Sequence, residues 1–204
     1  MSSESEQSKA ADTPTRILEA TVRILEAEGG KGVRMSDIAR ETGISRQALY
    51  LHFASRTELL TAATRWVDEQ LGLEERLAPS RHARSGEERL ALYIELWGNY
   101  IPDVYGVAKA LMLAEAGDEA AASAWRDRML AMKDGCRAIV EMLAAEGRLS
   151  PLLAVQPAID SLWTLMLVPN WEHLTQVCGW SREEYIERIT LIARQMLLSP
   201  ADQV

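Results

Sequence analysis

The stretch VRMSDIARETGISRQALYLHFASRTELL, residues 33–60, decides the fold expected for the N-terminal part of this chain. It holds two short helical patterns joined by a tight connection, Thr42-Gly43-Ile44, where Gly43 can adopt backbone angles that other residues avoid. The apolar residues that can fix the angle between the two helices are Ile38, Ala39, Ile44, Leu49 and Phe53. This pattern predicts a helix-turn-helix, whose second helix enters the major groove of DNA.

The second helix of this motif carries the side chains expected to meet DNA. Arg46 can donate two hydrogen bonds to guanine, and Gln47 can pair with the edge of adenine. Phosphate contacts are expected from the polar residues around them, namely Arg34, Ser45, Tyr50, His52 and Arg56. For each of these seven residues an exposed side chain without a DNA role is the alternative, and Tyr50 could also pack on the core of the motif.

The distribution of charge supports this interpretation of the motif. The chain of 204 residues has a formal net charge of -8, which is unusual for a protein that binds phosphates. Residues 31–56, however, contain five basic and two acidic residues, whereas residues 66–204 contain 13 and 21. A local basic patch on an acidic protein is sufficient for binding to the phosphate backbone.

Helical periodicity extends over nearly the whole chain, and alternation typical of strands is absent. Thr13 and Pro14 form a helix start, with Thr13 as N-cap, and Gly29-Gly30 is expected to end that helix. Residues 72–86 contain glycine, proline and serine without a long periodic run and predict a loop. Further helices are expected at 87–101, 103–115 (separated by Pro102), 118–147, 155–176 (interrupted by Pro169) and 182–198 (begun by a Ser181–Glu184 capping box).

Several classes of protein are disfavoured by what the sequence lacks. Residues 1–12 are polar and predict a disordered tail rather than a signal peptide, and no apolar run is long enough to span a bilayer. The two cysteines form no ligand pattern, which favours a cytoplasmic protein. We find no catalytic constellation, no metal-ligand spacing and no phosphate-binding glycine loop, so we expect no enzyme, no metal and no cofactor.

The residues of the motif resemble the signature of TetR-type transcriptional repressors. The resemblance covers residues 14–66, and the matching positions are Ile17, Ala20, Glu28-Gly29, Ile38-Ala39, Gly43-Ile44-Ser45, Leu49-Tyr50, His52-Phe53, Ser55-Arg56 and Leu59-Leu60. Two positions depart from the family, because Arg34 stands where threonine is usual and Arg56 stands where lysine is common. The resemblance implies an all-α protein of about nine helices with a three-helix DNA-binding head.

The resemblance also implies that the rest of the chain binds a ligand and dimerises. We therefore expect a helix-turn-helix domain at 13–55 and a ligand-binding and dimerisation domain at 56–204. Tryptophan and methionine side chains make adaptable apolar pockets, although each of them is more often part of a packed core. The expected pocket residues are Trp97, Met112, Trp125, Met129, Trp163, Met166 and Trp171, with Asn170 and His173 as polar anchors.

Two helices near the C-terminus favour a homodimer. Residues 162–168 are apolar nearly all round, so this helix needs cover on more than one side. The last helix adds an apolar face with Tyr185, Ile189, Ile192 and Met196. Two such helices from each protomer can form a four-helix interface.

These features together predict a dimeric regulator that binds a palindromic DNA operator and releases it when a small apolar or aromatic molecule binds. A DNA-binding regulator without such a ligand, constitutive or controlled by a protein partner, is the alternative. A helical enzyme is a more distant one. The resemblance implies that this regulator is a repressor, because repression is the common outcome in the family.

Overall fold

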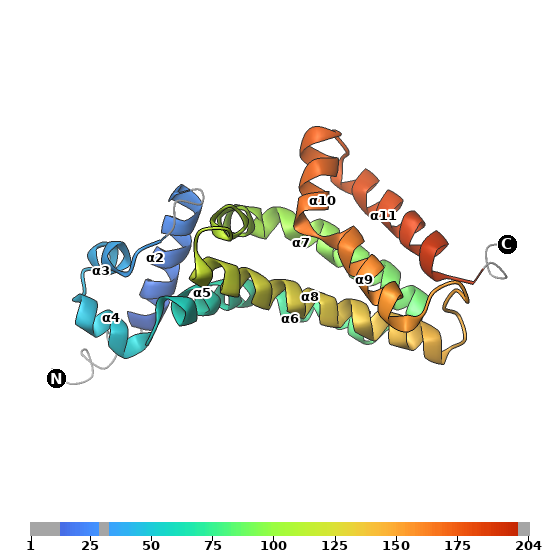
Figure 1. The fold of residues 1–204 in the computed structure, drawn as a ribbon, viewed down its shortest axis with the longest axis horizontal. Coiled ribbons are helices and arrows are strands. Elements are labelled where there is room, and N and C mark those ends of the chain that lie inside the picture. The colour runs from blue at the N-terminus through green and yellow to red at the C-terminus, as the bar shows by residue number, and fades with distance from the viewer. Residues whose placement is uncertain (1–12, 29–32, 200–204) are drawn as a thin grey trace. The chain divides into compact units, whose positions relative to one another are not determined.

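The computed structural model describes residues 13–28 and 33–199, and these confirm the all-α prediction (Figure 1). Within the described residues there is no strand, and a single isolated bridge joins Leu149 to Leu198. The helices are α2 Thr13–Glu28, α3 Met35–Thr42, α4 Arg46–His52, α5 Arg56–Gln70, α6 Leu73–Arg81, α7 Gly86–Ala114, α8 Glu119–Ala145, α9 Val155–Met166, α10 Val168–Glu172, the π-helix η1 His173–Val177 and α11 Arg182–Leu197. No helix in the described ranges is long and apolar enough to cross a membrane.

The chain forms two compact units that do not follow sequence order. Unit 1 consists of the described residues up to Leu71 together with Val104–Arg128. Unit 2 consists of Gly72–Asp103 and the described residues from Met129 onward. The domain boundary expected at residue 55 would divide the chain into two continuous segments. Each of the two units instead combines two segments that are distant in sequence.

Helices α2, α3, α4 and α5 build the N-terminal part of unit 1. α2 packs on both α3 and α5, and α3 packs on α4. Buried side chains between them include Ile17 of α2, Ile38 of α3 and Leu49 of α4, each 0% exposed. Gly43 has φ 70° and ends α3 in the left-handed conformation, so the tight connection between the two motif helices is as predicted.

Most predicted helix ends are found, and each has a local cause. The Ser55 side chain accepts a hydrogen bond from the amide of Glu58 and so begins α5. Ser181 and Glu184 form the expected capping box of α11. Pro169 stands in the first turn of α10 and separates it from α9, because proline lacks the amide that a continuous helix would need. The expected tail at 1–12 and the expected helix end at Gly29-Gly30 lie outside the described residues.

Two predictions from proline and glycine content are wrong. Residues 73–81 form α6 instead of a loop, with Gly72 in the left-handed conformation at its start and a Glu74–Arg81 ion pair along it. α7 runs through Pro102 where two helices were expected. The helix is buried both before Pro102, at Tyr100 and Ile101, and after it, at Val107. The free energy of this packing outweighs the backbone hydrogen bond lost at Pro102.

Smaller differences concern the helix starts. α2 already includes Thr13, the residue expected to be its N-cap. Arg34 occupies the N-cap of α3 without a side-chain hydrogen bond. This agrees with the expectation that arginine, which has no acceptor oxygen, cannot cap a helix.

Candidate nucleic-acid interface

α4 presents the two expected base-reading residues to solvent. Arg46 and Gln47 are exposed, whereas Leu49 on the opposite side is 0% exposed. The helix begins at Ser45, whose Oγ accepts a hydrogen bond of 3.0 Å from the amide of Ala48. A buried anchor and a side-chain cap therefore fix a helix of seven residues, which is too short to be stable alone.

Tyr50 lies beside Arg46 on the outer side of α4. The guanidinium carbon of Arg46 is 5.6 Å from the centroid of the Tyr50 ring, and 39% of Tyr50 is exposed. A cation–π contact of this kind orders both side chains before any ligand arrives. The ring therefore has a packing role, and its exposure leaves the hydroxyl free to serve as the predicted phosphate contact.

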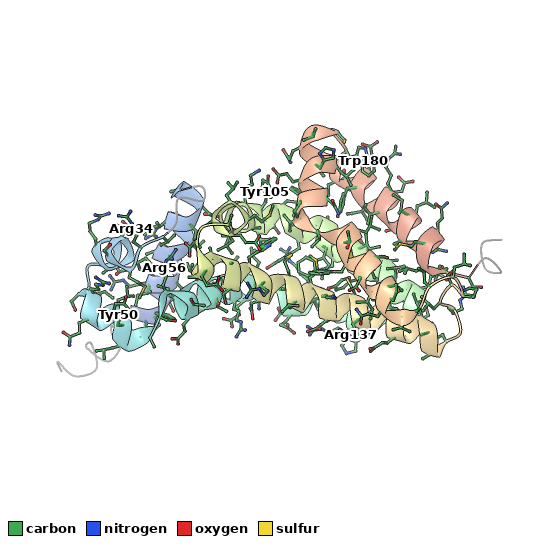
Figure 2. All side chains as sticks on the ribbon, in the orientation of Figure 1. Arg34, Tyr50, Arg56, Tyr105, Arg137 and Trp180 are labelled. Carbon is green, nitrogen blue, oxygen red and sulfur yellow. The ribbon has the colours of Figure 1, made fainter. Side chains whose placement is uncertain are left out.

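The other expected phosphate contacts surround α4, except for Arg56. Ser45, His52 and Arg34 are exposed, and Figure 2 shows Arg34 and Tyr50 on the part of unit 1 formed by α3 and α4. The hydroxyl of Ser45 accepts from a backbone amide and still has its proton to donate to a phosphate oxygen. The exposure of these three residues is compatible with phosphate contacts, which stay a prediction.

Arg56, at the first residue of α5, is engaged within unit 1. Its Nε donates to the carbonyl oxygen of Val33, and its Nη1 donates to Asp118 Oδ1 at 2.8 Å. Its Nη2 donates to the other carboxylate oxygen of Asp118. Burial raises the pKa of the Asp118 carboxyl, but hydrogen bonds from Arg56 and from two backbone amides outweigh this effect and leave the pKa below its ordinary value.

Sequence reasoning missed one exposed apolar residue on the recognition helix. Leu51 is 83% exposed, although it is flanked by Tyr50 and His52. It follows Gln47 by four residues, so both side chains lie on the same side of α4. That spacing is present in the sequence, but a search restricted to polar residues as DNA contacts does not find a leucine.

The expected ligand-pocket residues do not all fall in one unit. Met112 and Trp125 belong to unit 1, and the others belong to unit 2. In unit 2, Trp97 makes edge contacts with Tyr93 and Tyr100 at centroid distances of 6.0 and 5.5 Å. The unit 2 candidates range from buried to exposed: Met129, Met166 and Trp171 are buried, Trp97, Trp163 and Asn170 are half-buried, and His173 is exposed.

Comparison with known proteins agrees with the geometry of α3 and α4. The model of the family "Bacterial regulatory proteins, tetR family" matches residues 17–63, the segment from α2 to α5. Residues 17–63 therefore carry the sequence pattern of the tetR family. The helix-turn-helix of the chain is α3 and α4, and the resemblance expected from the sequence is confirmed.

The sequence matches to curated relatives cover about a third of the chain or less. The HTH-type transcriptional regulator CymR of Pseudomonas putida is 33% identical over 63 residues, which are 31% of this chain and 31% of CymR. The nucleoid occlusion factor SlmA of Marinomonas sp. is 32% identical over 63 residues, which are 31% of this chain and 32% of SlmA. The chain thus spans about a third of the length of these curated relatives it matches.

Similarity in fold extends much further. A transcriptional regulator from Saccharomonospora viridis, solved in complex with choline, has a TM-score of 0.69 and 19% sequence identity to the chain. The alignment covers 92% of this chain and 98% of that structure. The fold of the chain therefore resembles that of this regulator also in the helices after α5, which the family model does not cover.

Proposed function

We propose that this protein is a cytoplasmic, homodimeric regulator that binds a palindromic operator through α4 of each protomer. The observation that carries the proposal is the outward face of α4, where Arg46 and Gln47 stand exposed above the buried Leu49. Arginine and glutamine are the residues that read guanine and adenine in the major groove. Arg34, exposed just before α3, supplies positive charge for a phosphate beside it.

Selection from a pool of random duplex DNA tests this proposal directly. We expect the purified protein to enrich a palindrome whose half-site centres lie about 34–36 Å apart, one turn of DNA. A salt-sensitive affinity without any enriched sequence would show that α4 does not read bases. The selected operator then serves as the probe in every binding experiment described below.

We further propose that Leu51 contacts a thymine methyl group next to the base pair read by Gln47. Its 83% exposed side chain would be removed from water on binding, and thymine is the base that offers a methyl group in the major groove. Leu51→Ala is expected to weaken operator binding about fourfold for each half-site, corresponding to about 0.8 kcal/mol for each buried methyl-sized group. Fluorescence anisotropy with a labelled operator measures this change.

Replacing single thymines of the operator by uracil, which lacks the methyl group, provides the matched control. A single replacement at one position of each half-site should cost the wild type about the affinity that Leu51→Ala loses for one half-site of the natural operator. The variant should be insensitive to uracil at that position. Equal sensitivity of both proteins at every position would contradict the contact.

The dimer is proposed to form through apolar side chains left exposed on α11. Tyr185 and Ile189 are buried within unit 2, so half of the face expected to meet the partner is already covered. Leu191 and Ile192 are instead 54% and 42% exposed. Neighbouring exposed apolar residues of this size mark surfaces that bind another protein.

The double substitution Leu191→Glu, Ile192→Glu is expected to give a monomer, because carboxylates would be buried unpaired in the interface. Sedimentation velocity measures the oligomeric state, and circular dichroism checks that the helices remain. Leu113→Glu, at a 57% exposed leucine of unit 1, is the matched control and should stay dimeric. A double variant that remains a dimer would place the interface elsewhere.

We propose that a small organic effector binds among the aromatic residues of unit 2. The indole N–H group of Trp163 is buried and has no hydrogen-bond partner among the described residues. Buried donors are normally paired, so a ligand with an acceptor atom is favoured over a purely apolar one. The S. viridis neighbour was solved with choline, which makes choline the first probe.

A titration of tryptophan fluorescence and of operator affinity with choline and with neutral aromatic alcohols tests the effector proposal. An effector must weaken operator binding by the same factor by which the operator weakens effector binding, because coupling between two sites is reciprocal. An operator affinity unchanged by every compound that alters the fluorescence would favour a regulator without a small-molecule ligand.

A further inference from the structure

Arg56 uses three of its five N–H donors inside the protein. Nε binds the carbonyl of Val33, and the two terminal nitrogens bind both oxygens of Asp118. The side chains of Arg56 and Asp118 are 29% and 13% exposed. Two parallel hydrogen bonds of this kind add geometric specificity as well as attraction.

The acceptors of Arg56 stand at the beginnings of two other helices. Val33 comes just before Arg34, whose carbonyl accepts the first hydrogen bonds of α3 from Asp37 and Ile38 at 3.0 and 3.2 Å. Asp118 caps α8, because its Oδ1 also accepts from the amides of Ala120 and Ala121 at 3.1 and 3.2 Å. One guanidinium therefore connects the starts of α3, α5 and α8 within unit 1.

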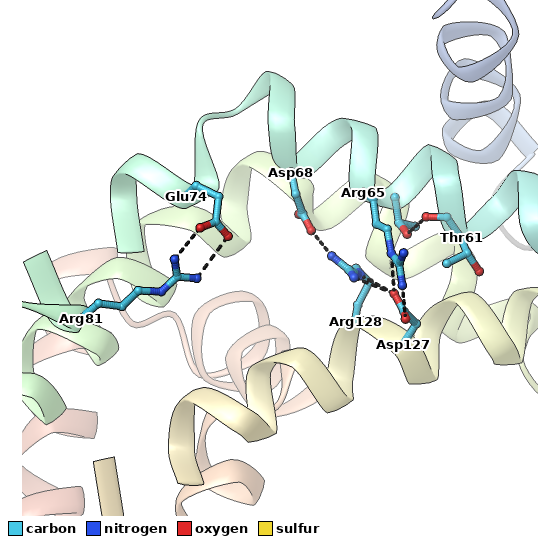
Figure 3. A network of polar contacts seen from close by, with 8 residues as sticks. Thr61, Arg65, Asp68, Glu74, Arg81, Asp127 and Arg128 are labelled. Carbon is cyan, nitrogen blue, oxygen red and sulfur yellow. Dashed lines mark hydrogen bonds and ion pairs between the residues drawn. The ribbon is translucent and has the colours of Figure 1, made fainter. Parts of the chain in front are cut away.

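A second group of ion pairs shows that α5 and α8 run in the same direction. Arg65 binds Asp127 at 2.8 Å, and these residues are 62 positions apart, as Arg56 and Asp118 are. Residue numbers therefore rise together along the two helices from one ion pair to the next. Arg128 of α8 also binds Asp68 of α5, as Figure 3 shows. The Arg65–Asp127 contact joins the same two helices without touching the segment before α3.

We propose that Arg56 is a positioning residue, which holds the start of α3 to the start of α8 so that α4 is presented to DNA in a fixed orientation. The inference rests on the proposed DNA-binding function. α3 packs on α4, so a fixed start of α3 also limits the movement of α4. A head that is ordered before binding loses less entropy when it binds.

The charge of Arg56 argues for this role over a direct phosphate contact. Its guanidinium is neutralised by the carboxylate of Asp118, whereas Arg34 and Arg46 are exposed and have no such carboxylate partner among the described residues. A phosphate approaching Arg56 would meet a neutral pair. Lysine binds phosphate as a point charge but lacks the planar fork that serves Val33 and Asp118 together, and this difference separates the two roles experimentally.

Four variants test the proposal on the selected operator. Arg56→Lys keeps the charge and removes the fork, and Arg56→Ala removes both. Asp118→Asn keeps a residue suited to cap α8 and removes the ion pair. Arg65→Ala is the matched control, because it breaks a different α5–α8 contact, the Arg65–Asp127 ion pair, and leaves Val33 and Asp118 untouched.

We expect Arg56→Lys, Arg56→Ala and Asp118→Asn each to weaken operator binding by about 5- to 150-fold, the usual range for coupling between parts of a protein. The slope of log affinity against log salt should remain that of the wild type, and Arg65→Ala should bind like the wild type. Two results together would make Arg56 a phosphate contact and overturn the proposal. These are wild-type affinity in Arg56→Lys and, in Arg56→Ala, a salt slope smaller by about 0.9 for each phosphate that is no longer neutralised.

Urea unfolding without DNA separates failure of this proposal from failure of the proposed function. In a cycle of Arg56→Ala, Asp118→Asn and the double variant, the unfolding equilibrium constants should be non-additive by about 2- to 150-fold. Additive effects would show that the Arg56–Asp118 pair does not connect the helices, whether or not DNA binds. If the wild type selects no DNA sequence, the proposed function fails and the positioning role fails with it, while the cycle still measures the pair.

Discussion

Replacing Arg46 or Gln47 by alanine is expected to abolish most of the operator specificity of the protein. Each side chain is exposed on a helix whose fold depends on Leu49 and Ser45, so its removal should leave the structure intact. Removing a bidentate hydrogen-bonded pair with a base costs about 1–3 kcal/mol per half-site, and both half-sites of a dimer are affected. Anisotropy titrations with the selected operator and single-base variants of it measure the change.

The pattern of altered specificity distinguishes base reading from a general loss of charge. Gln47→Ala carries no change in charge, so its salt slope should match the wild type while discrimination at one base pair disappears. Arg182→Ala, at an exposed arginine of α11, is the control for loss of one positive charge and should keep full specificity. Uniformly weaker binding to all sequences in Arg46→Ala would instead identify a phosphate contact.

Gly135→Ala is expected to destabilise unit 2 by about 2–4 kcal/mol, although alanine normally favours a helix over glycine. A Cβ at this position would lie 2.1 Å from the hydroxyl oxygen of Tyr93 and 2.4 Å from its Cζ. Tyr93 is 4% exposed and donates a hydrogen bond of 2.8 Å to the carbonyl of Met132. Overpacking and the loss of this buried hydrogen bond each cost about 1–3 kcal/mol.

Calorimetry should show the Gly135→Ala effect as a fall in Tm of about 5–15 °C for a chain of this length. Gly106→Ala, in the exposed part of α7, is the matched control, because its Cβ would meet the flexible end of Glu26. That variant should be neutral or slightly more stable. Adding Tyr93→Phe to Gly135→Ala removes the clashing hydroxyl and should recover part of the lost stability, and no recovery would contradict the packing argument.

Patterns that are local in sequence predicted the helix-turn-helix and most helix ends. Gly43, Ser45, Ser55 and the Ser181–Glu184 pair act on backbone groups within a few residues of themselves, so their effects do not depend on the rest of the chain. The exposed face of α4 follows for the same reason. Its periodicity places Leu49 inward and Arg46 and Gln47 outward.

Where local preference competes with packing, the sequence was not sufficient. Proline in residues 73–81 and at 102 predicted a loop and a break, but α6 and α7 persist. In α7, burial of apolar side chains on both sides of Pro102 supplies more free energy than one backbone hydrogen bond. The burial of a residue depends on segments that are distant in the chain, so local sequence patterns cannot predict it.

The sequence by itself determined the helical class, the tetR-family head and the residues that α4 turns outward, because these depend on periodicity and capping within one helix. Only the tertiary structure decided the surroundings of Arg56. Its partners, Val33 and Asp118, lie 23 and 62 residues away. Charge and sequence position made Arg56 look like another phosphate contact. In the folded chain the carboxylate of Asp118 pairs with the charge of Arg56. An arginine that is already paired in this way can position helices instead of binding phosphate.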